Sequence, residues 1–273
     1  MGAAAENARL ARIEIFPVKS LDGLPLSEAA ITSGGILEGD RAFAIFDGEG
    51  KVVNGKRTPR IHDLRCAYDD AATEVRLWSD DGAHAGQFPL AAGARLHRWL
   101  SDFFGFAVSL RHEPIRGFPD DPEAYGPTIV SEASLRAVQD WYPGLALQNV
   151  RRRFRTNLEL EGGAPFCEDS LYGAPGELTP FLVGEVAFRG HNPCQRCVVP
   201  TRDPDSGMAI RGFQKSFAQL RQESLPPWAN RQRFNHFYRF AVNTSVPPTE
   251  AGKRLRVGDV VRLDRPTENQ GVA

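Results

Sequence analysis

Two cysteines separated by two residues are the strongest chemical signal in this chain. They are Cys194 and Cys197, and Arg196 directly precedes the second thiol. The thiolate form of cysteine is the nucleophile and the metal ligand, and a neighbouring positive charge makes it easier to form. The run Val198-Val199 predicts the start of a strand, and the segment 203–207 predicts a turn. The thiols are therefore expected at the entrance of a strand, where a cofactor can reach them.

Several other roles of this pair stay open on the residues alone. A closed zinc site needs two more ligands, but Cys66, Cys167 and the six histidines form no second close pair. A thioredoxin-like redox motif should open a helix, which Pro193 and Pro200 disfavour. A structural disulfide does not suit a reducing cytoplasm, and simple buried cysteines need no ligand. The remaining interpretation is a single thiolate that binds a soft transition metal or metal cofactor.

The composition indicates a globular protein with one large domain or two small ones. The chain has 273 residues, of which 41% are hydrophobic, and its formal net charge is -1. Nothing in this overall charge points to nucleic acid as a partner. Two local basic runs, residues 151–155 and 231–239, are either solvated faces or sites for a phosphate-bearing ligand.

The sequence also predicts a cytoplasmic protein with no membrane partner. No apolar stretch approaches the roughly 18 residues that a membrane span needs. Residues 1–7 lack the basic and apolar regions of a secretory signal. The four cysteines show no framework spacing, which fits a reducing compartment.

Short alternating segments separated by turn residues predict a β-rich α+β fold. Helical periodicity begins near Arg95, Ser131 is placed to cap a second helix, and residues 215–222 predict a third. The Pro/Gly/Asp-rich segment 116–126 is the best candidate for a domain boundary. Strands are expected at residues 12–16, 41–46, 74–78, 106–110, 128–130, 155–160, 182–188, 239–243 and 255–263. This pattern favours a β-barrel with accessory helices.

Five short motifs together resemble a known family. They occur in the order seen in MOSC proteins, a name that abbreviates molybdenum cofactor sulfurase C-terminal domain. The resemblance is to the branch that has an N-terminal β-barrel domain and includes the mitochondrial amidoxime-reducing components and their bacterial counterparts. It implies an N-terminal β-barrel portion at residues 1–120 and a MOSC domain, a MOSC-type β-barrel, at residues 121–273. The motifs are Pro17-Val18-Lys19-Ser20, Gly39-Asp40-Arg41, Ser131-Glu132-Ala133-Ser134-Leu135, Phe154-Arg155-Thr156-Asn157 and Cys194-Gln195-Arg196-Cys197.

The resemblance implies a molybdenum cofactor, a pyranopterin whose metal takes one protein thiolate. The matching cysteine is Cys197, which is thereby the expected metal ligand and catalytic residue. Arginine forks and a helix N-terminus suit the phosphate and oxo groups of such an anionic cofactor, and an asparagine suits a pterin edge. The expected cofactor-binding residues are Lys19, Ser20, Arg41, Ser131, Arg155, Asn157 and Arg196.

The resemblance also implies an activity, namely reduction of N-hydroxylated or N-oxide substrates. The substrate is a small molecule, and the electrons come from a separate protein, because no four-cysteine cluster is left over for an iron–sulfur centre. Pyridoxal phosphate binding is a further expectation from the resemblance alone. Two alternatives stay open: a cofactor-binding or persulfide-carrying module without redox turnover, and a zinc-binding or redox-inert interaction domain.

Three further positions are noted but not assigned to catalysis. The acidic pair Glu168-Asp169 is expected in a loop, with a structural or supporting role. Cys194 is a supporting thiol or a buried one. Position 195 is Gln where relatives often have a small residue, which affects hydrogen bonding near the metal.

Overall fold

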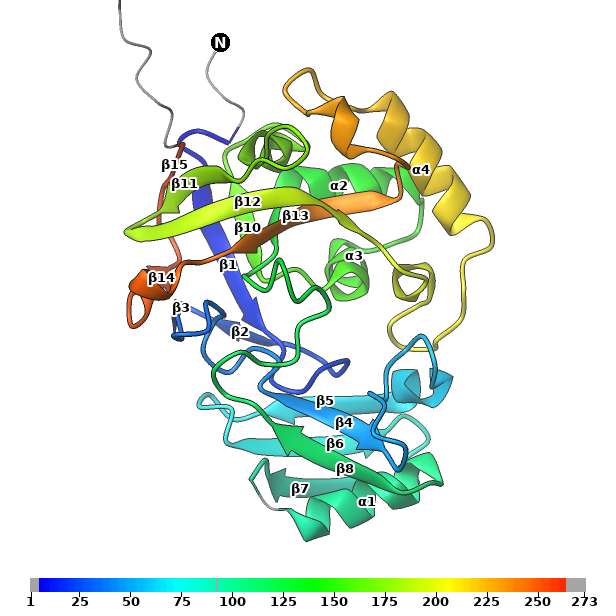
Figure 1. Cartoon of the computed structure of the whole chain (residues 1–273). Coiled ribbons are helices and arrows are strands. Elements are labelled where there is room, and N and C mark those ends of the chain that lie inside the picture. Colours follow the sequence, from blue (N-terminus) through cyan, green and yellow to red (C-terminus); the bar gives the residue numbers. More distant parts are fainter. Residues whose placement is uncertain (1–4, 92, 264–273) are drawn as a thin grey trace, which may run out of the picture.

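An eight-stranded sheet forms the larger part of the molecule. The computed structural model describes residues 5–91 and 93–263. In Figure 1 the sheet fills the upper half and carries three helices on one side. In spatial order its strands are β15 (Val261–Leu263), β11 (Thr179–Val183), β12 (Val186–Gln195), β13 (Arg239–Ser245), β9 (Ile129–Ser131), β10 (Leu158–Glu161), β1 (Arg9–Ile15) and β2 (Leu24–Leu26).

Backbone hydrogen bonds between the two ends of the described chain close this sheet into a barrel. The amide of Leu10 donates to Asp259 O over 2.8 Å, and the amide of Gly258 donates to Leu10 O over 2.7 Å. These bonds join β1 to the residues that precede β15. The interior is apolar, with side chains such as Ile13, Leu158 and Val242 fully buried. The barrel therefore has few free strand edges.

Three helices cover the barrel through a layer of aromatic side chains. They are α2 (Glu132–Trp141), α3 (Leu147–Phe154) and α4 (Phe213–Glu223). Phe154 of α3 and Phe217 of α4 pack with Phe240 of β13, at ring-centroid distances of 4.4 and 5.8 Å from it. Offset aromatic contacts of this kind fix helices in place. The sequence did not predict α3, which is short and ends in three arginines that favour the C-terminal end of the helix dipole.

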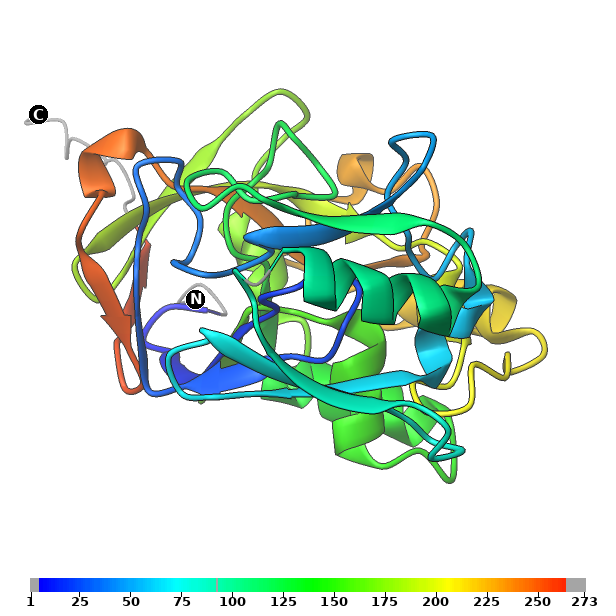
Figure 2. The same cartoon turned by 90° about the horizontal axis from the view of Figure 1, so that it is seen from below.

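The smaller part of the molecule is built from two sheets and one helix. β4 (Phe43–Asp47) pairs with β8 (Val108–His112), and β5 (Leu64–Tyr68), β6 (Glu74–Ser79) and β7 (Ala85–Pro89) form the second sheet. Figure 2 shows α1 (Ala94–Phe104) lying between the two sheets. The helix ends at Gly105, as its sequence predicts, in a left-handed conformation that glycine adopts without strain. One further pair, β3 (Glu28–Ala30) with β14 (Arg254–Arg256), lies against the barrel.

The expected fold class is confirmed: the chain is β-rich, with a barrel, accessory helices and an N-terminal β portion. The division at residue 120 stays a prediction. β1 and β2 precede that position and nevertheless pair within the large sheet. The polar residues 265–273, whose composition predicts turn-like structure, lie outside the described residues.

Candidate functional site

A cavity of about 640 Å³ lies between the two parts of the molecule. Ligand pockets commonly have volumes of about 300–1,000 Å³. Lys19, Ser20 and Arg41 line it from the smaller part, and Arg155, Arg196 and Cys197 line it from the barrel part. The structure thus gathers six of the eight expected site residues, from four of the five motifs, on one cavity.

Strand β12 carries the first thiol to the cavity wall. Its pairing with β13 shifts register twice, the second time between Pro193 and Gln195, because proline has no amide hydrogen for the ladder. Cys194 lies within this irregular strand end and contacts the cavity. The chain then leaves the sheet, so the expected strand at Val198-Val199 is wrong. Val199–Thr201 is instead a short 3-10 helix. A strand is disfavoured here because Pro200 has no backbone N–H to donate to a neighbouring strand.

Each thiol has its own hydrogen-bond donor. Arg196 donates from Nη1 to the sulfur of Cys194 over 3.2 Å. The amide of Val199 donates to the sulfur of Cys197 over 3.4 Å. The fixed positive charge therefore contacts Cys194 and not the expected metal ligand. The thiols lie at the exit of a strand and not at its entrance.

Arg155 is a cation of the cavity wall that stacks on an aromatic ring and has no carboxylate partner within the described chain. Its guanidinium lies 4.1 Å from the centroid of the Phe16 ring. Burial, and next the charge of Arg41, lower the pKa of Arg155. No carboxylate among the described residues forms an ion pair with it. A half-buried cation without a partner is unfavourable, so this position suits an anionic ligand.

Three residues of the cavity wall hold a left-handed backbone that side chains rarely adopt. The φ angles are 76° at Ser20, 50° at Arg41 and 51° at Arg155. Such conformations cost on the order of 1–3 kcal/mol each and cluster at functional sites. Their presence around one cavity supports the view that the wall is shaped for a ligand.

Asn157 supports the wall from behind and does not line the cavity. Its Oδ1 accepts from Arg41 Nη1 over 3.3 Å and from the amide of Thr128 over 3.2 Å. Its Nδ2 donates to Glu14 O over 3.1 Å. Asn157 is thus placed to orient Arg41, whose guanidinium also pairs with Asp40.

The loop 116–126, expected only as a boundary, forms part of the cavity wall. Asp120 from this loop pairs with Lys19 over 2.7 Å, and Lys19 also donates to Phe118 O over 2.8 Å. Burial lowers the pKa of Lys19. For Asp120 burial opposes the change, but the charges of Lys19 and Arg41 lower its pKa to about 2. Sequence reasoning missed Asp120, since only the fold brings the loop across the cavity.

Ser131 is not a lining residue of the cavity. Its hydroxyl accepts from the amide of Ser134 over 3.1 Å and caps α2, which confirms the expected cap. The side chain is buried and contacts the hydroxyl of Ser134 over 2.7 Å, which in turn donates to Glu168 over 2.9 Å. The geometry gives Ser131 a structural role, because its polar atom is used within the helix cap.

The expected acidic pair belongs to a buried cluster away from the cavity lining. Glu168 and Asp169 lie in the 3-10 helix Cys167–Leu171, which corrects the expected loop. Asp169 pairs with Arg221 of α4, and both side chains are almost fully buried. Burial, and next the charge of Asp169, raise the pKa of Glu168 to about 7. These contacts join α2, α4 and the barrel, so the pair is structural.

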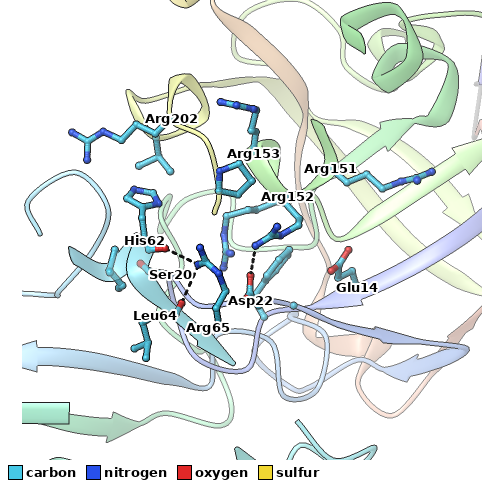
Figure 3. Close-up of a pocket in the computed structure, with 16 residues that line it drawn as sticks. Glu14, Ser20, Asp22, His62, Leu64, Arg65, Arg151, Arg152, Arg153 and Arg202 are labelled. Atoms are coloured by element: carbon cyan, nitrogen blue, oxygen red, sulfur yellow. Dashed lines mark hydrogen bonds and ion pairs between the residues drawn. The ribbon is translucent and has the colours of Figure 1, made fainter. Parts of the chain in front are cut away.

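A second, smaller cavity of about 60 Å³ adjoins the first. Most of the basic run 151–155 lines it. Figure 3 shows Arg152 directed to Asp22, an ion pair of 3.2 Å. Arg151 pairs with Glu159 over 2.6 Å, and Arg153 pairs with Asp203 over 3.2 Å. The arginines of this run that belong to α3 are therefore compensated by carboxylates, unlike Arg155.

The described residues contain no group of three or more His, Cys, Asp and Glu side chains that could hold a metal ion. A zinc site with four protein ligands thus has no candidate among residues 5–91 and 93–263. Within the same residues, no helix has the length and apolar character required to cross a bilayer.

Two family models match nearly the whole described chain. The MOSC N-terminal beta barrel domain matches residues 7–102, and the MOSC domain matches residues 127–262. The chain belongs to the MOSC family. Its cavity lies between the two matched segments and takes residues from both.

Curated relatives are similar at low identity. The chain is 28% identical over 240 residues to mitochondrial amidoxime-reducing component 1 of Homo sapiens, covering 74% of this chain and 68% of that protein. It is 24% identical over 294 residues to mitochondrial amidoxime reducing component 2 of Homo sapiens, covering 92% and 82%. It is 27% identical over 221 residues to molybdenum cofactor sulfurase of Drosophila grimshawi, covering 69% of this chain and 27% of that protein.

Proposed function

We propose that this MOSC protein binds a molybdenum cofactor in the large cavity and reduces N-hydroxylated or N-oxide-type substrates. Two of the similar proteins are mitochondrial amidoxime-reducing components, and a third is a molybdenum cofactor sulfurase. The observation that carries the proposal is the convergence of Arg155, which lacks a carboxylate partner, with two thiols on one wall. A basic wall with a soft sulfur donor fits an anionic cofactor that contains a soft metal.

In this proposal each side chain at the cavity has a role that follows from its chemistry. Arg155 and Arg41 bind phosphate or oxo groups, since guanidinium forks form directed, charge-assisted hydrogen bonds. Asn157 holds Arg41 in orientation through its 3.3 Å contact. Cys197 provides the thiolate ligand, and the Val199 amide stabilises its charge. The cofactor, when bound, supplies the two-electron removal of oxygen from the substrate.

The remaining walls exclude bulk water and admit substrate. Pro119, Asp120 and Tyr125 of the loop 116–126 also line the cavity. A positioned substrate reacts faster because its orientation is fixed in advance. The electrons come from a separate donor protein in this proposal, and the substrate is a small molecule. Cytoplasmic location and pyridoxal phosphate binding stay predictions.

A second candidate is a cofactor-binding or persulfide-carrying module without turnover. Two observations favour it. The chain is similar to molybdenum cofactor sulfurase. A second thiol, Cys194, also lies on the same wall as Cys197. In that function a sulfur or cofactor held at Cys197 passes to a partner protein.

Turnover by cofactor-loaded protein distinguishes the two candidates. Protein from a host that makes molybdenum cofactor is supplied with dithionite-reduced viologen and benzamidoxime, and benzamidine is measured. The reductase proposal predicts benzamidine formation by the wild type and by Cys194→Ser, and none by Cys197→Ser. Loaded wild-type protein that forms no product from benzamidoxime, an aromatic N-oxide or a hydroxamic acid contradicts the proposal and favours the carrier.

A further inference from the structure

The four cysteines of the chain fall into two chemically different pairs. Cys66 is 7% exposed and Cys167 is fully buried. Burial raises the pKa of both thiols to about 12. Cys194 and Cys197 are half-buried and line the large cavity. The second pair is thus reachable by a small oxidant, whereas the first pair is buried.

Arg196 gives Cys194 the surroundings of a reactive cysteine. The guanidinium donates to its sulfur over 3.2 Å. The same guanidinium donates to Phe154 O and lies 5.3 Å from the Phe154 ring centroid, so its position is fixed at both ends. Reactive cysteines lie in electropositive, partly exposed surroundings, and Arg41 and Arg239 line the same cavity. The hydrogen bond stabilises negative charge on the sulfur of Cys194.

Cys197 is the cysteine nearest to Cys194 in the sequence and lines the same cavity. It follows Cys194 by three residues, beyond the point where β12 leaves the sheet. Both residues contact one cavity, and the sulfur of Cys197 accepts only a backbone amide, that of Val199. Redox-sensitive cysteines are typically accessible thiolates with a second cysteine close by to resolve the oxidised sulfur.

We propose that Cys194 is a peroxide-reactive nucleophile that forms a reversible disulfide with Cys197 when no cofactor is bound. The Cys194 thiolate attacks one oxygen of hydrogen peroxide, which breaks the O–O bond, gives Cys194 sulfenic acid and releases hydroxide. The Cys197 thiol then attacks the sulfenic sulfur, and water leaves with the thiol proton. Two thiols and one peroxide yield one disulfide and two waters, and a thiol reductant reverses the reaction.

The disulfide has a consequence that rests on the proposed function. It uses the sulfur that we assign to molybdenum, so oxidised protein cannot accept the metal until it is reduced. The disulfide itself depends only on the two thiols and Arg196. The site is therefore a redox modification site of the empty protein as well as a ligand site.

The disulfide is tested on the full chain made in a host without molybdenum cofactor. The folded protein is treated with hydrogen peroxide, alkylated without denaturation, and studied by intact mass and peptide mapping. The proposal predicts a mass lower by two hydrogen atoms and a cross-linked peptide joining Cys194 to Cys197, with Cys66 and Cys167 still reduced after denaturation. Two alkylable thiols at 194 and 197 after treatment, or oxidation first at 66 or 167, overturn it.

Single variants identify which thiol reacts first. Cys197→Ser should accumulate a sulfenic acid at Cys194 that dimedone traps, whereas Cys194→Ser should form no disulfide and no trapped adduct on the same time scale. Arg196→Gln should react about tenfold more slowly, the loss expected for one charge-assisted hydrogen bond. Circular dichroism of each variant controls for folding. Equal trapping at Cys197 in Cys194→Ser, or an unchanged rate in Arg196→Gln, contradicts the assignment of Cys194 as the nucleophile.

A parallel measurement separates this inference from the proposed function. Oxidised and reduced apoprotein are incubated with cofactor released from a molybdenum enzyme, and bound molybdenum is measured. Uptake by the reduced form alone supports both statements. If neither form takes up molybdenum, the proposed function fails while the disulfide stands on the mass data. Equal uptake by a form proven to be disulfide-bonded refutes the link between them.

Discussion

Arg221 and Arg155 each lie 4.1 Å from the centroid of a phenylalanine ring, yet their surroundings differ in one decisive respect. Arg221 stacks on Phe166 and pairs with the buried carboxylate of Asp169. Arg155 stacks on Phe16, faces the large cavity and has no carboxylate among the described residues. The charge of the first arginine is paired with a carboxylate within the fold, whereas the second faces the cavity without such a partner in the described chain. Compensation of charge, more than the number of basic residues, therefore marks the candidate site.

Breaking the buried ion pair of Arg221 and Asp169 is expected to lower the unfolding free energy more than any other change considered. Arg221→Met leaves Asp169 as an uncompensated charge in the interior, which costs about 3–5 kcal/mol of unfolding free energy. Urea unfolding measures the loss. Cofactor content per folded molecule should not change, because Arg221 does not line the cavity.

A double variant is the control for that loss. Arg221→Met with Asp169→Asn removes both charges, so it should recover most of the lost free energy. A loss below about 1 kcal/mol in Arg221→Met would show that the pair is not structural and would break the contrast with Arg155.

Arg155 and Arg153 give a matched pair on the cavity side. Arg155→Met should leave the unfolding free energy unchanged or slightly higher, since it removes a half-buried cation without a carboxylate partner, but pterin binding should be lost. Arg153→Met should lose about 1–3 kcal/mol, because Arg153 donates to Pro200 O over 3.1 Å and pairs with Asp203. Unfolding curves and pterin fluorescence test both. The opposite pattern, a destabilised Arg155→Met that keeps its pterin, contradicts the account.

The raised pKa of Glu168, in the buried cluster, predicts that the free energy of unfolding depends on pH. Burial raises its pKa in the folded state from 4.5 to about 7. The folded state therefore holds this proton more tightly than the unfolded state, and the resulting stabilisation is complete below about pH 4.5 and lost as pH rises to about 7. Glu168→Gln keeps a neutral side chain at all pH values.

The measurement is the difference in unfolding free energy between wild type and Glu168→Gln as a function of pH. Between pH 4.5 and 7 the wild type should lose about 1–3 kcal/mol relative to the variant. A constant difference for Glu168→Gln across this range would show that the buried carboxyl does not titrate there.

The smallest effect is expected at Ser131, where structure and resemblance suggest different roles. Ser131→Ala removes the cap of α2 and should cost about 1 kcal/mol. Since Ser131 does not line the cavity, molybdenum and pterin content should stay at the wild-type level. Ser131→Thr retains the capping hydroxyl without placing a charge at this buried position and should restore most of the stability. If Ser131→Ala instead loses its cofactor while its unfolding free energy is unchanged, Ser131 is a cofactor-binding residue and its role is not only structural.

The sequence predicts the fold class and most of the cavity wall, for reasons that are local. Turn residues and alternation specify short strands, and Ser131 and Gly105 mark helix ends through backbone chemistry. The motifs around Lys19, Arg41 and Arg155 supply lining residues because each motif follows or precedes a strand that the barrel positions.

What the sequence did not predict depends on contacts between distant segments. Whether Arg155 or Arg153 is compensated depends on Asp203, fifty positions further along the chain, and no local pattern reports it. The contact of Arg196 with Cys194 rather than Cys197 follows from the register shift at Pro193. Asp120 enters the cavity only because the fold carries its loop across the opening.

The most direct test of the central claim is the metal and pterin content of the purified protein. Wild type, Cys197→Ser and Cys194→Ser are produced in a host that makes molybdenum cofactor, and molybdenum and pterin are measured per folded molecule. We predict near-stoichiometric molybdenum and pterin in the wild type and in Cys194→Ser, and loss of the metal in folded Cys197→Ser. A folded wild type without molybdenum, or a Cys197→Ser variant that keeps the metal while Cys194→Ser loses it, would contradict the account.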